Sequence, residues 1–128
     1  MKNPGAGAKR VLVVEDEPSI TEVCLRTLNR EGFEVDTAAN GVEAEDKIRG
    51  KDYDLVLIDI KTPEMNGKDL YHYITEKHPS LVNRVVFTTG DTMSGDTQSF
   101  LRQSGRPFLP KPFTPDELIK IVTENLRH

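Results

Sequence analysis

The stretch DLVLIDIKTPEMNG, residues 54–67, is the part of the sequence that indicates most about the expected structure. Its apolar run from Leu55 to Ile58 predicts a short strand buried on both faces, as in a parallel sheet. Asp59 follows this run directly, and a loop comes next. Because an unpaired buried charge is costly, a carboxylate at the end of such a strand is expected to be paired, bound to a metal or engaged in chemistry.

Strand and helix patterns alternate five times along the chain. Strand patterns occupy, in order, residues 11–14, 33–38, 55–58, 84–90 and 106–110. Helical spacing of apolar residues or capping signals predict a helix after each strand, the fourth over 93–104 and the last beginning at Thr114. This alternation predicts a parallel sheet with helices on both faces. Pro107, Pro110 and Pro112 crowd the fifth strand and place it at an edge of the sheet, because proline removes a ladder donor.

The composition describes one globular domain rather than a specialised class of protein. The chain has 128 residues, of which 36% are hydrophobic and 30% charged, and its net charge is −4. This acidic balance disfavours direct binding to nucleic acid, which favours basic patches. Cys24 lies on the apolar face of the first predicted helix and is expected in the protein core. A single cysteine suggests neither a disulfide nor a zinc site. A single thiol is compatible with a reducing, cytoplasmic location.

No stretch of the sequence is long and apolar enough to insert into a membrane. The longest purely apolar runs, VLVV and LVLI, have four residues, whereas a transmembrane helix needs about 20.

The first residues are small, polar and rich in glycine. We therefore expect a flexible leader over residues 1–8 and a single folded domain over residues 9–128.

Polar residues collect at the carboxyl ends of the predicted strands, where open parallel sheets place their sites. They are Glu15 and Asp16 after the first strand, Asp59 after the third, Thr88 and Thr89 in the fourth, and Lys111 after the fifth. Neighbouring carboxylates repel one another unless a cation lies between them. Oxygen ligands without His or Cys favour Mg²⁺ or Mn²⁺. Together with a lysine and a hydroxyl, such a centre suits phosphoryl transfer, with Asp59 as the nucleophile that forms an acyl phosphate.

Four pieces of the chain, in order, resemble a known family. VLVVEDEP, DLVLIDIKTPEMNG, VVFTTG and FLPKPF are together similar to the receiver domain of two-component signalling, the response-regulator domain, over roughly residues 9–127. The resemblance implies an α/β, flavodoxin-like (βα)₅ doubly wound sheet with strand order 2-1-3-4-5. It also implies that Asp59 accepts a phosphoryl group from a phosphohistidine on a sensor histidine kinase or phosphotransfer domain. Such a domain is a signalling module rather than a turnover enzyme.

The resemblance assigns roles residue by residue. Glu15, Asp16, Asp59 and the backbone carbonyl of Lys61 would hold Mg²⁺. Lys111 would contact the phosphoryl group, and the Lys111–Pro112 peptide bond would be cis.

The same resemblance assigns the switch. Thr89, rather than Thr88, is the switch hydroxyl because it directly precedes the small residue Gly90. Phe108 occupies the aromatic switch position, and since it has no hydroxyl its switching is a change of packing. The face made by the fourth helix, fifth strand and fifth helix would then change its affinity for partners. The module would be a monomer or a weak dimer, and GRPFLPKPF resembles receivers attached to hybrid sensor kinases.

Two other functions are compatible with an α/β fold but fit the motifs less well. Phosphatases of the haloacid-dehalogenase type use an aspartyl phosphate but want a second Asp two residues later, where this chain has Lys61. A nucleotide- or flavin-binding module of similar architecture would want a GxGxxG or phosphate-binding loop, and the sequence has neither.

Lys61 and Asp91 lead to a prediction about lifetime. They lie two residues after Asp59 and Thr89, at positions that the family places at the mouth of the site. Since their charges are opposite, we expect them to pair across the mouth, hinder water and slow dephosphorylation modestly.

Overall fold

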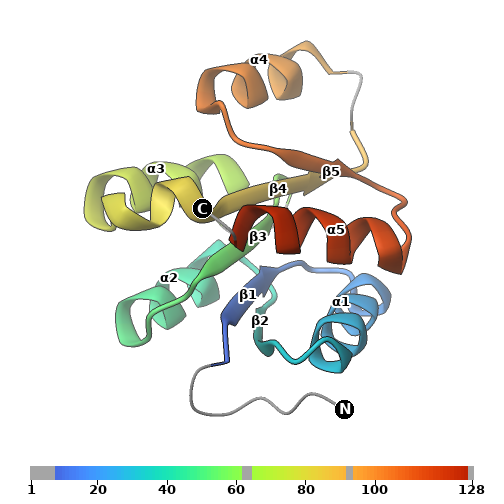
Figure 1. Cartoon of the computed structure of the whole chain (residues 1–128). Coiled ribbons are helices and arrows are strands. Elements are labelled where there is room, and N and C mark those ends of the chain that lie inside the picture. The colour runs from blue at the N-terminus through green and yellow to red at the C-terminus, as the bar shows by residue number, and fades with distance from the viewer. Residues whose placement is uncertain (1–7, 62–64, 92–93, 127–128) are drawn as a thin grey trace.

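The computed structural model describes residues 8–61, 65–91 and 94–126 (Figure 1). Strands and α-helices alternate through these residues as the sequence predicts. Their bounds are β1 (Arg10–Val14), α1 (Pro18–Arg30), β2 (Glu34–Ala38), α2 (Gly41–Gly50), β3 (Leu55–Asp59), α3 (Gly67–Lys77), η1 (Pro79–Arg84), β4 (Val85–Thr89), α4 (Gly95–Ser104), β5 (Phe108–Pro110) and α5 (Pro115–Leu126). The predicted leader over residues 1–8 falls, except for Ala8, outside the described residues.

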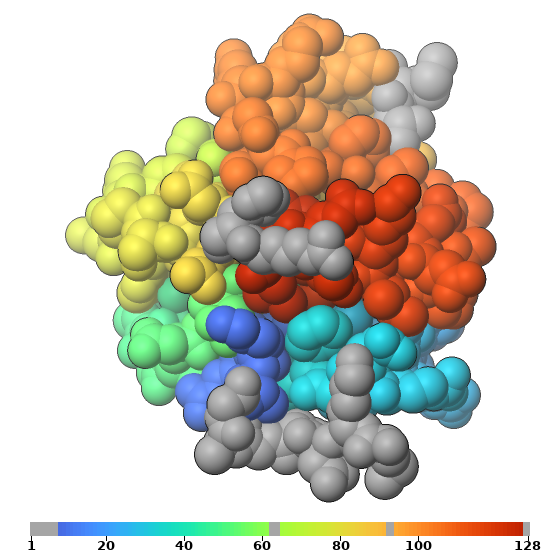
Figure 2. Space-filling view, in the orientation of Figure 1, coloured from blue at the N-terminus to red at the C-terminus, as the bar shows by residue number. Residues whose placement is uncertain are grey.

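The five strands form one parallel sheet in the order β2-β1-β3-β4-β5, which confirms the predicted topology. β3 therefore lies in the centre, between β1 and β4, and the proline-rich β5 lies at an edge. α1 and α5 cover one face of the sheet, and α2, α3 and α4 pack on the other. In the space-filling view, α5 lies next to the segment that contains α1 and β2 (Figure 2), and α5 contacts α1.

The central strands are buried on both faces, so their sequences are continuously apolar. Val13 and Leu57 face the α1–α5 layer, where they meet Leu28 and Leu118. Their neighbours in the chain, such as Ile58, face the opposite layer. Each fully buried aliphatic side chain stabilises the fold by about 1.5–3 kcal/mol relative to an exposed one. This double burial makes β3 a rigid support for the carboxylate at its end.

Local capping fixes where several helices begin. The Asn40 side chain accepts a hydrogen bond from Glu43 N at 2.9 Å at the start of α2. Thr114 and Glu117 form a reciprocal capping box before α5, with bonds of 2.8 and 3.1 Å. Satisfied end groups of this kind hold the loops between strands and helices in place.

Gly67 allows α3 to begin close to the end of β3. A Cβ atom at this position would lie 2.7 Å from Ile60 Cα and 2.8 Å from the carbonyl oxygen of Asp59. The Gly67 amide also donates to the Ile60 carbonyl at 3.0 Å. Only glycine fits this approach, and the contact fixes the backbone just after Asp59.

The structure adds features that the sequence patterns did not indicate. The chain from Pro79 to Arg84 forms the 3₁₀ helix η1 before β4 begins. Tyr71, in α3, is buried, and its ring packs against Phe87 and Phe100 with centroid distances of 5.3 and 5.8 Å. These partners lie on β4 and α4, far along the chain, so helical periodicity alone does not reveal them.

Candidate functional site

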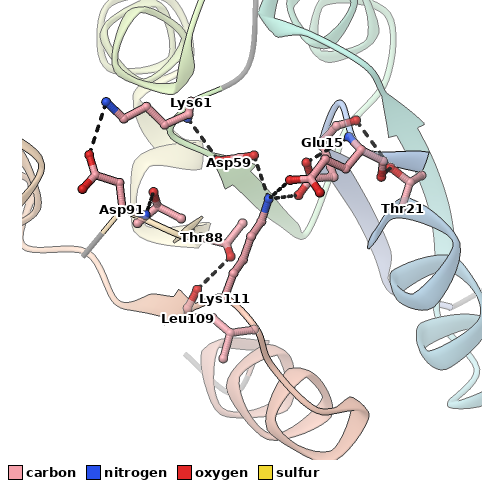
Figure 3. Close-up of polar contacts among 10 residues, drawn as sticks. Glu15, Thr21, Asp59, Lys61, Thr88, Asp91, Leu109 and Lys111 are labelled. Atoms are coloured by element: carbon pink, nitrogen blue, oxygen red, sulfur yellow. Dashed lines mark hydrogen bonds and ion pairs between the residues drawn. The ribbon is translucent and has the colours of Figure 1, made fainter. Parts of the chain in front are cut away.

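The carboxyl ends of β1, β3 and β5 bring three charged side chains together (Figure 3). Asp59, the last residue of β3, is 3% exposed, and Glu15, which follows β1, is equally buried. Nζ of Lys111 lies 2.6 Å from Oε1 of Glu15 and 2.9 Å from Oδ2 of Asp59. The predicted juxtaposition of these three residues is therefore present.

Glu17 joins this group, a contact that the sequence analysis missed. Its carboxylate lies 3.3 Å from Lys111 Nζ, and its amide donates to Oε2 of Glu15 at 3.1 Å. One carboxylate oxygen each from Glu15, Glu17 and Asp59 lie within 4.8 Å of one another. Asp16, the predicted ligand between the two glutamates, is exposed and is not part of this group.

Burial and neighbouring charges together shift the pKa values of Glu15 and Lys111. Burial, opposed by the hydrogen bond from Lys111 and reinforced by the Asp59 charge, raises the pKa of Glu15 to about 7. Burial alone would lower the pKa of Lys111, but its bonds to Glu15 and Asp59 outweigh this and hold the pKa above its ordinary value. Lys111 is therefore a permanent cation within the acidic group.

The donor set fits a hard divalent cation. It consists of carboxylate oxygens, without the His or Cys ligands that zinc prefers. Oε1 of Glu15 is buried, and the Lys111 ammonium group, 2.6 Å away, is the one cation that the described residues place beside it. Three carboxylates face one ammonium group, so the site retains negative charge that a divalent cation would balance.

The two threonines of β4 have different roles. Thr88 donates its hydroxyl to the Leu109 carbonyl at 2.7 Å and so ties β4 to β5 (Figure 3). Thr89 is fully buried, and its Oγ1 accepts a hydrogen bond from Asp91 N at 3.0 Å. Thr88 is thus a structural residue of the strand, and Thr89 contacts the loop that leads to α4.

Lys61 and Asp91 pair as the sequence predicts. Lys61 Nζ lies 3.5 Å from Asp91 Oδ2, and the two side chains are 58% and 37% exposed. The Lys61 amide also donates to Oδ1 of Asp59 at 3.0 Å, so this residue contacts the central carboxylate through its backbone (Figure 3). The ion pair connects the loop after β3 with the loop after β4.

The edge strand carries the remaining predicted residues. Phe108 is 36% exposed at the start of β5. The Lys111–Pro112 peptide bond is cis, as expected. The Lys111 amide donates to the Thr89 carbonyl at 3.0 Å, which anchors the end of β5 beside β4.

Comparison with known proteins assigns the chain to a family. A family model described as the response regulator receiver domain matches residues 11–123. The chain belongs to this family. It is a receiver domain of two-component systems, and the comparisons give no support to the alternative of a haloacid-dehalogenase-like phosphatase.

The similar curated proteins include both sensor kinases and transcriptional regulators. The sensor kinase CckA of Brucella abortus is 32% identical over 123 residues, which are 94% of this chain and 13% of CckA. The DNA-binding transcriptional regulator NtrC of Escherichia coli is 34% identical over 118 residues, 92% of this chain and 25% of NtrC. The chain thus spans only a small part of these relatives.

Solved receiver structures superpose closely on this fold. A CheY-like receiver domain protein from Methanospirillum hungatei has a TM-score of 0.86 at 30% identity, covering 94% of this chain and 95% of that one. TrrA of Thermotoga maritima, solved in complex with Mg²⁺ and BeF, has a TM-score of 0.79 at 34% identity, covering 91% and 98%. None of the described helices is long and apolar enough to cross a bilayer.

Proposed function

We propose that Asp59 is the phosphoacceptor of this receiver domain and takes a phosphoryl group from a phosphohistidine on a histidine kinase or phosphotransfer domain. The observation that carries the proposal is the contact of Asp59 with Lys111 beside the carboxylates of Glu15 and Glu17. The likeness to TrrA, which was solved with Mg²⁺ and BeF, supports it.

In the proposed reaction, a carboxylate oxygen of Asp59 attacks phosphorus and an acyl phosphate forms. The phosphorus–nitrogen bond breaks, and its electron pair leaves with the imidazole of the donor. Lys111 neutralises phosphoryl charge through its ammonium group, which already contacts Oδ2 of Asp59 at 2.9 Å. Oδ1 is held by the Lys61 amide at 3.0 Å, so the carboxylate is oriented before the donor arrives.

Mg²⁺, when bound, would supply further neutralisation of the phosphoryl oxygens. Glu15 and Asp59 are common to the predicted ligand set and to the observed acidic group, and Glu17 is an additional candidate. Asp16 and the Lys61 carbonyl remain predicted ligands, derived from the family resemblance.

In this proposal, phosphorylation of Asp59 alters the partner-binding face through Thr89 and α4. Asp91 contacts the switch hydroxyl through its amide, and its Oδ1 accepts a bond from Ser94 N at 3.2 Å. Ser94 in turn caps α4 by accepting from Thr97 N at 3.5 Å. If Thr89 turns toward the phosphoryl group, it leaves the Asp91 amide, and the start of α4 loses part of its support.

Intact-mass spectrometry after incubation with a small acyl-phosphate donor tests the acceptor. We expect one phosphoryl adduct that requires Mg²⁺ and is absent from Asp59→Asn. The matched control is Asp52→Asn, which removes the same charge from an exposed residue that follows α2. An adduct that persists in Asp59→Asn would contradict the assignment, and so would a folded, Mg²⁺-supplied protein that acquires none from either the donor or a phosphorylated kinase.

The same proposal places the domain in the cytoplasm and gives it a cognate kinase. It also makes α4, β5 and α5 the face that binds the output partner. Because the chain is similar to parts of both sensor kinases and transcriptional regulators, the receiver could belong to either type of protein. A receiver attached to a hybrid kinase would pass its phosphoryl group to another histidine, whereas a regulator would use the phosphorylated state to alter its output domain.

A further inference from the structure

A polar cavity lies at the amino ends of the strands, opposite the carboxyl ends where Asp59 lies. Its volume is about 440 Å³, and it is lined by Ser80, Asn83, Arg84, Arg106 and Asn125. Arg84 immediately precedes β4 and Arg106 lies just before β5, so the cavity is at the amino ends of these strands. β4 has five residues, which places the cavity roughly 15 Å from the acidic group. We call it the Arg84–Arg106 cavity.

The described lining of this cavity carries charge of one sign. Two of the described lining residues have guanidinium groups, and none of them is acidic. Arg106 donates from Nε to the Val85 carbonyl at 2.9 Å and from Nη2 to the Asn83 carbonyl at 2.8 Å. Across the residues that the structure describes, no carboxylate pairs with Arg106. Within the described part of the chain, the partners of its guanidinium are therefore two peptide carbonyls.

The half-buried position of Arg106 makes this lack of a counterion costly. Burial lowers the pKa of its guanidinium, because removal from water disfavours the charged form. The two carbonyl bonds account for two of the five N–H donors that a guanidinium has. Charged groups that are withdrawn from water are usually paired in proteins, so an anion would complete the hydrogen bonds of this guanidinium.

Arg84 is only weakly neutralised. Its Nη1 lies 3.5 Å from Oδ1 of Asp54, and both side chains are partly exposed. The other oxygen of Asp54 accepts from the Arg10 amide at 2.8 Å, so this carboxylate is shared. A neighbouring cavity also contains Arg84 but includes Asp52 and Asp54 in its wall. An anion is therefore expected on the Arg106 side, away from these carboxylates.

We propose that the Arg84–Arg106 cavity binds a small oxyanion, a phosphate ester or a dicarboxylate, independently of phosphorylation at Asp59. The guanidinium group offers parallel donors that match the oxygens of phosphate and carboxylate. Ser80 and Asn83 add neutral hydrogen-bonding side chains to the same wall. This site is separate from the proposed phosphoacceptor, so its presence does not depend on that assignment.

Backbone amide NMR shifts during titration with inorganic phosphate or malonate, without Mg²⁺ and at constant ionic strength, test the proposal. We expect saturable shifts at residues 80–84 and 106 and around Asn125, with those around Asp59 unchanged. Arg106→Gln should weaken binding about tenfold, the loss typical of one charged hydrogen bond. The matched control Arg102→Gln removes the same charge from an exposed residue of α4 and should leave the affinity unchanged.

The two probes distinguish the sources of the anion. Tighter binding of phosphate would assign a phosphate ester, and tighter binding of malonate a dicarboxylate. The proposal is overturned if neither probe saturates by about 50 mM, a limit well above the range of specific binding. It is also overturned if Arg102→Gln weakens binding as much as Arg106→Gln. If Arg106→Gln unfolds, Arg84→Gln must show the selective loss instead.

Discussion

Removing the charge of Lys61 should shorten the lifetime of the acyl phosphate on Asp59. The Lys61–Asp91 pair spans 3.5 Å between exposed side chains, and such pairs contribute about 0.2–1 kcal/mol. If that energy must be overcome for water to reach the phosphoryl group, its loss accelerates hydrolysis by roughly 1.4- to 5-fold. The upper value requires that the pair remain closed in the phosphorylated form.

The assay is the first-order decay of the phosphorylated protein after the donor is removed, followed by intact mass. Lys61→Gln is the cleaner change, because Asp91 also contacts Thr89 and Ser94 through other atoms. Asp91→Asn and the double variant complete a cycle that isolates the pair from the single effects. High salt should reduce the difference, since exposed pairs are screened. An unchanged lifetime in Lys61→Gln, or strictly additive effects in the cycle, would refute the reasoning.

Three further predictions concern stability and reactivity. Gly67→Ala should lower stability by about 1–3 kcal/mol in denaturant unfolding, because its Cβ would clash with the chain after Asp59. Gly95→Ala meets no atom within 4 Å and should be close to neutral; equal losses would contradict the steric account. Burial raises the pKa of the Cys24 thiol from 9.0 to about 12, so iodoacetamide at pH 8 should modify it only in denaturant. Since the unfolded thiol ionises first, stability should fall from pH 9 toward 12 relative to Cys24→Ala. Thr88→Val should cost about 1 kcal/mol, measured by thermal unfolding, through the lost bond to Leu109, and an unchanged melting temperature would argue against it.

The sequence was sufficient for the sheet and for the centre of the site because both follow from strand ends. Apolar runs end at Glu15 and Asp59, and a parallel sheet places those ends at one edge. The order of the strands came from the family resemblance, and the structure agrees with it. Lys111 follows β5, two strands away from β3, so its contact with both carboxylates depends on its long side chain, which reaches past β4.

The finer arrangement depends on side-chain direction, which strand patterns do not specify. Both residues are exposed, but the Glu17 carboxylate contacts Lys111 and Asp16 is not part of the acidic group, because adjacent residues in a loop have no fixed alternation. A sequence signal was nonetheless present, because Glu17 is two residues after Glu15 and directly precedes the proline that begins α1. The partners of Tyr71 were equally hidden, since they come from segments that only the completed fold brings together.

The brevity of β5 has a consequence for how this domain would communicate. Phe108, at its start, is exposed to solvent, and Lys111, one residue past its end, contacts Asp59. Only two residues separate a ring that faces outward from an ammonium group that faces the acidic centre. β5 also has a neighbouring strand on one side only. A change of charge at Asp59 would therefore reach the exposed ring through residues 108–111 alone, the three residues of β5 and the lysine that follows them.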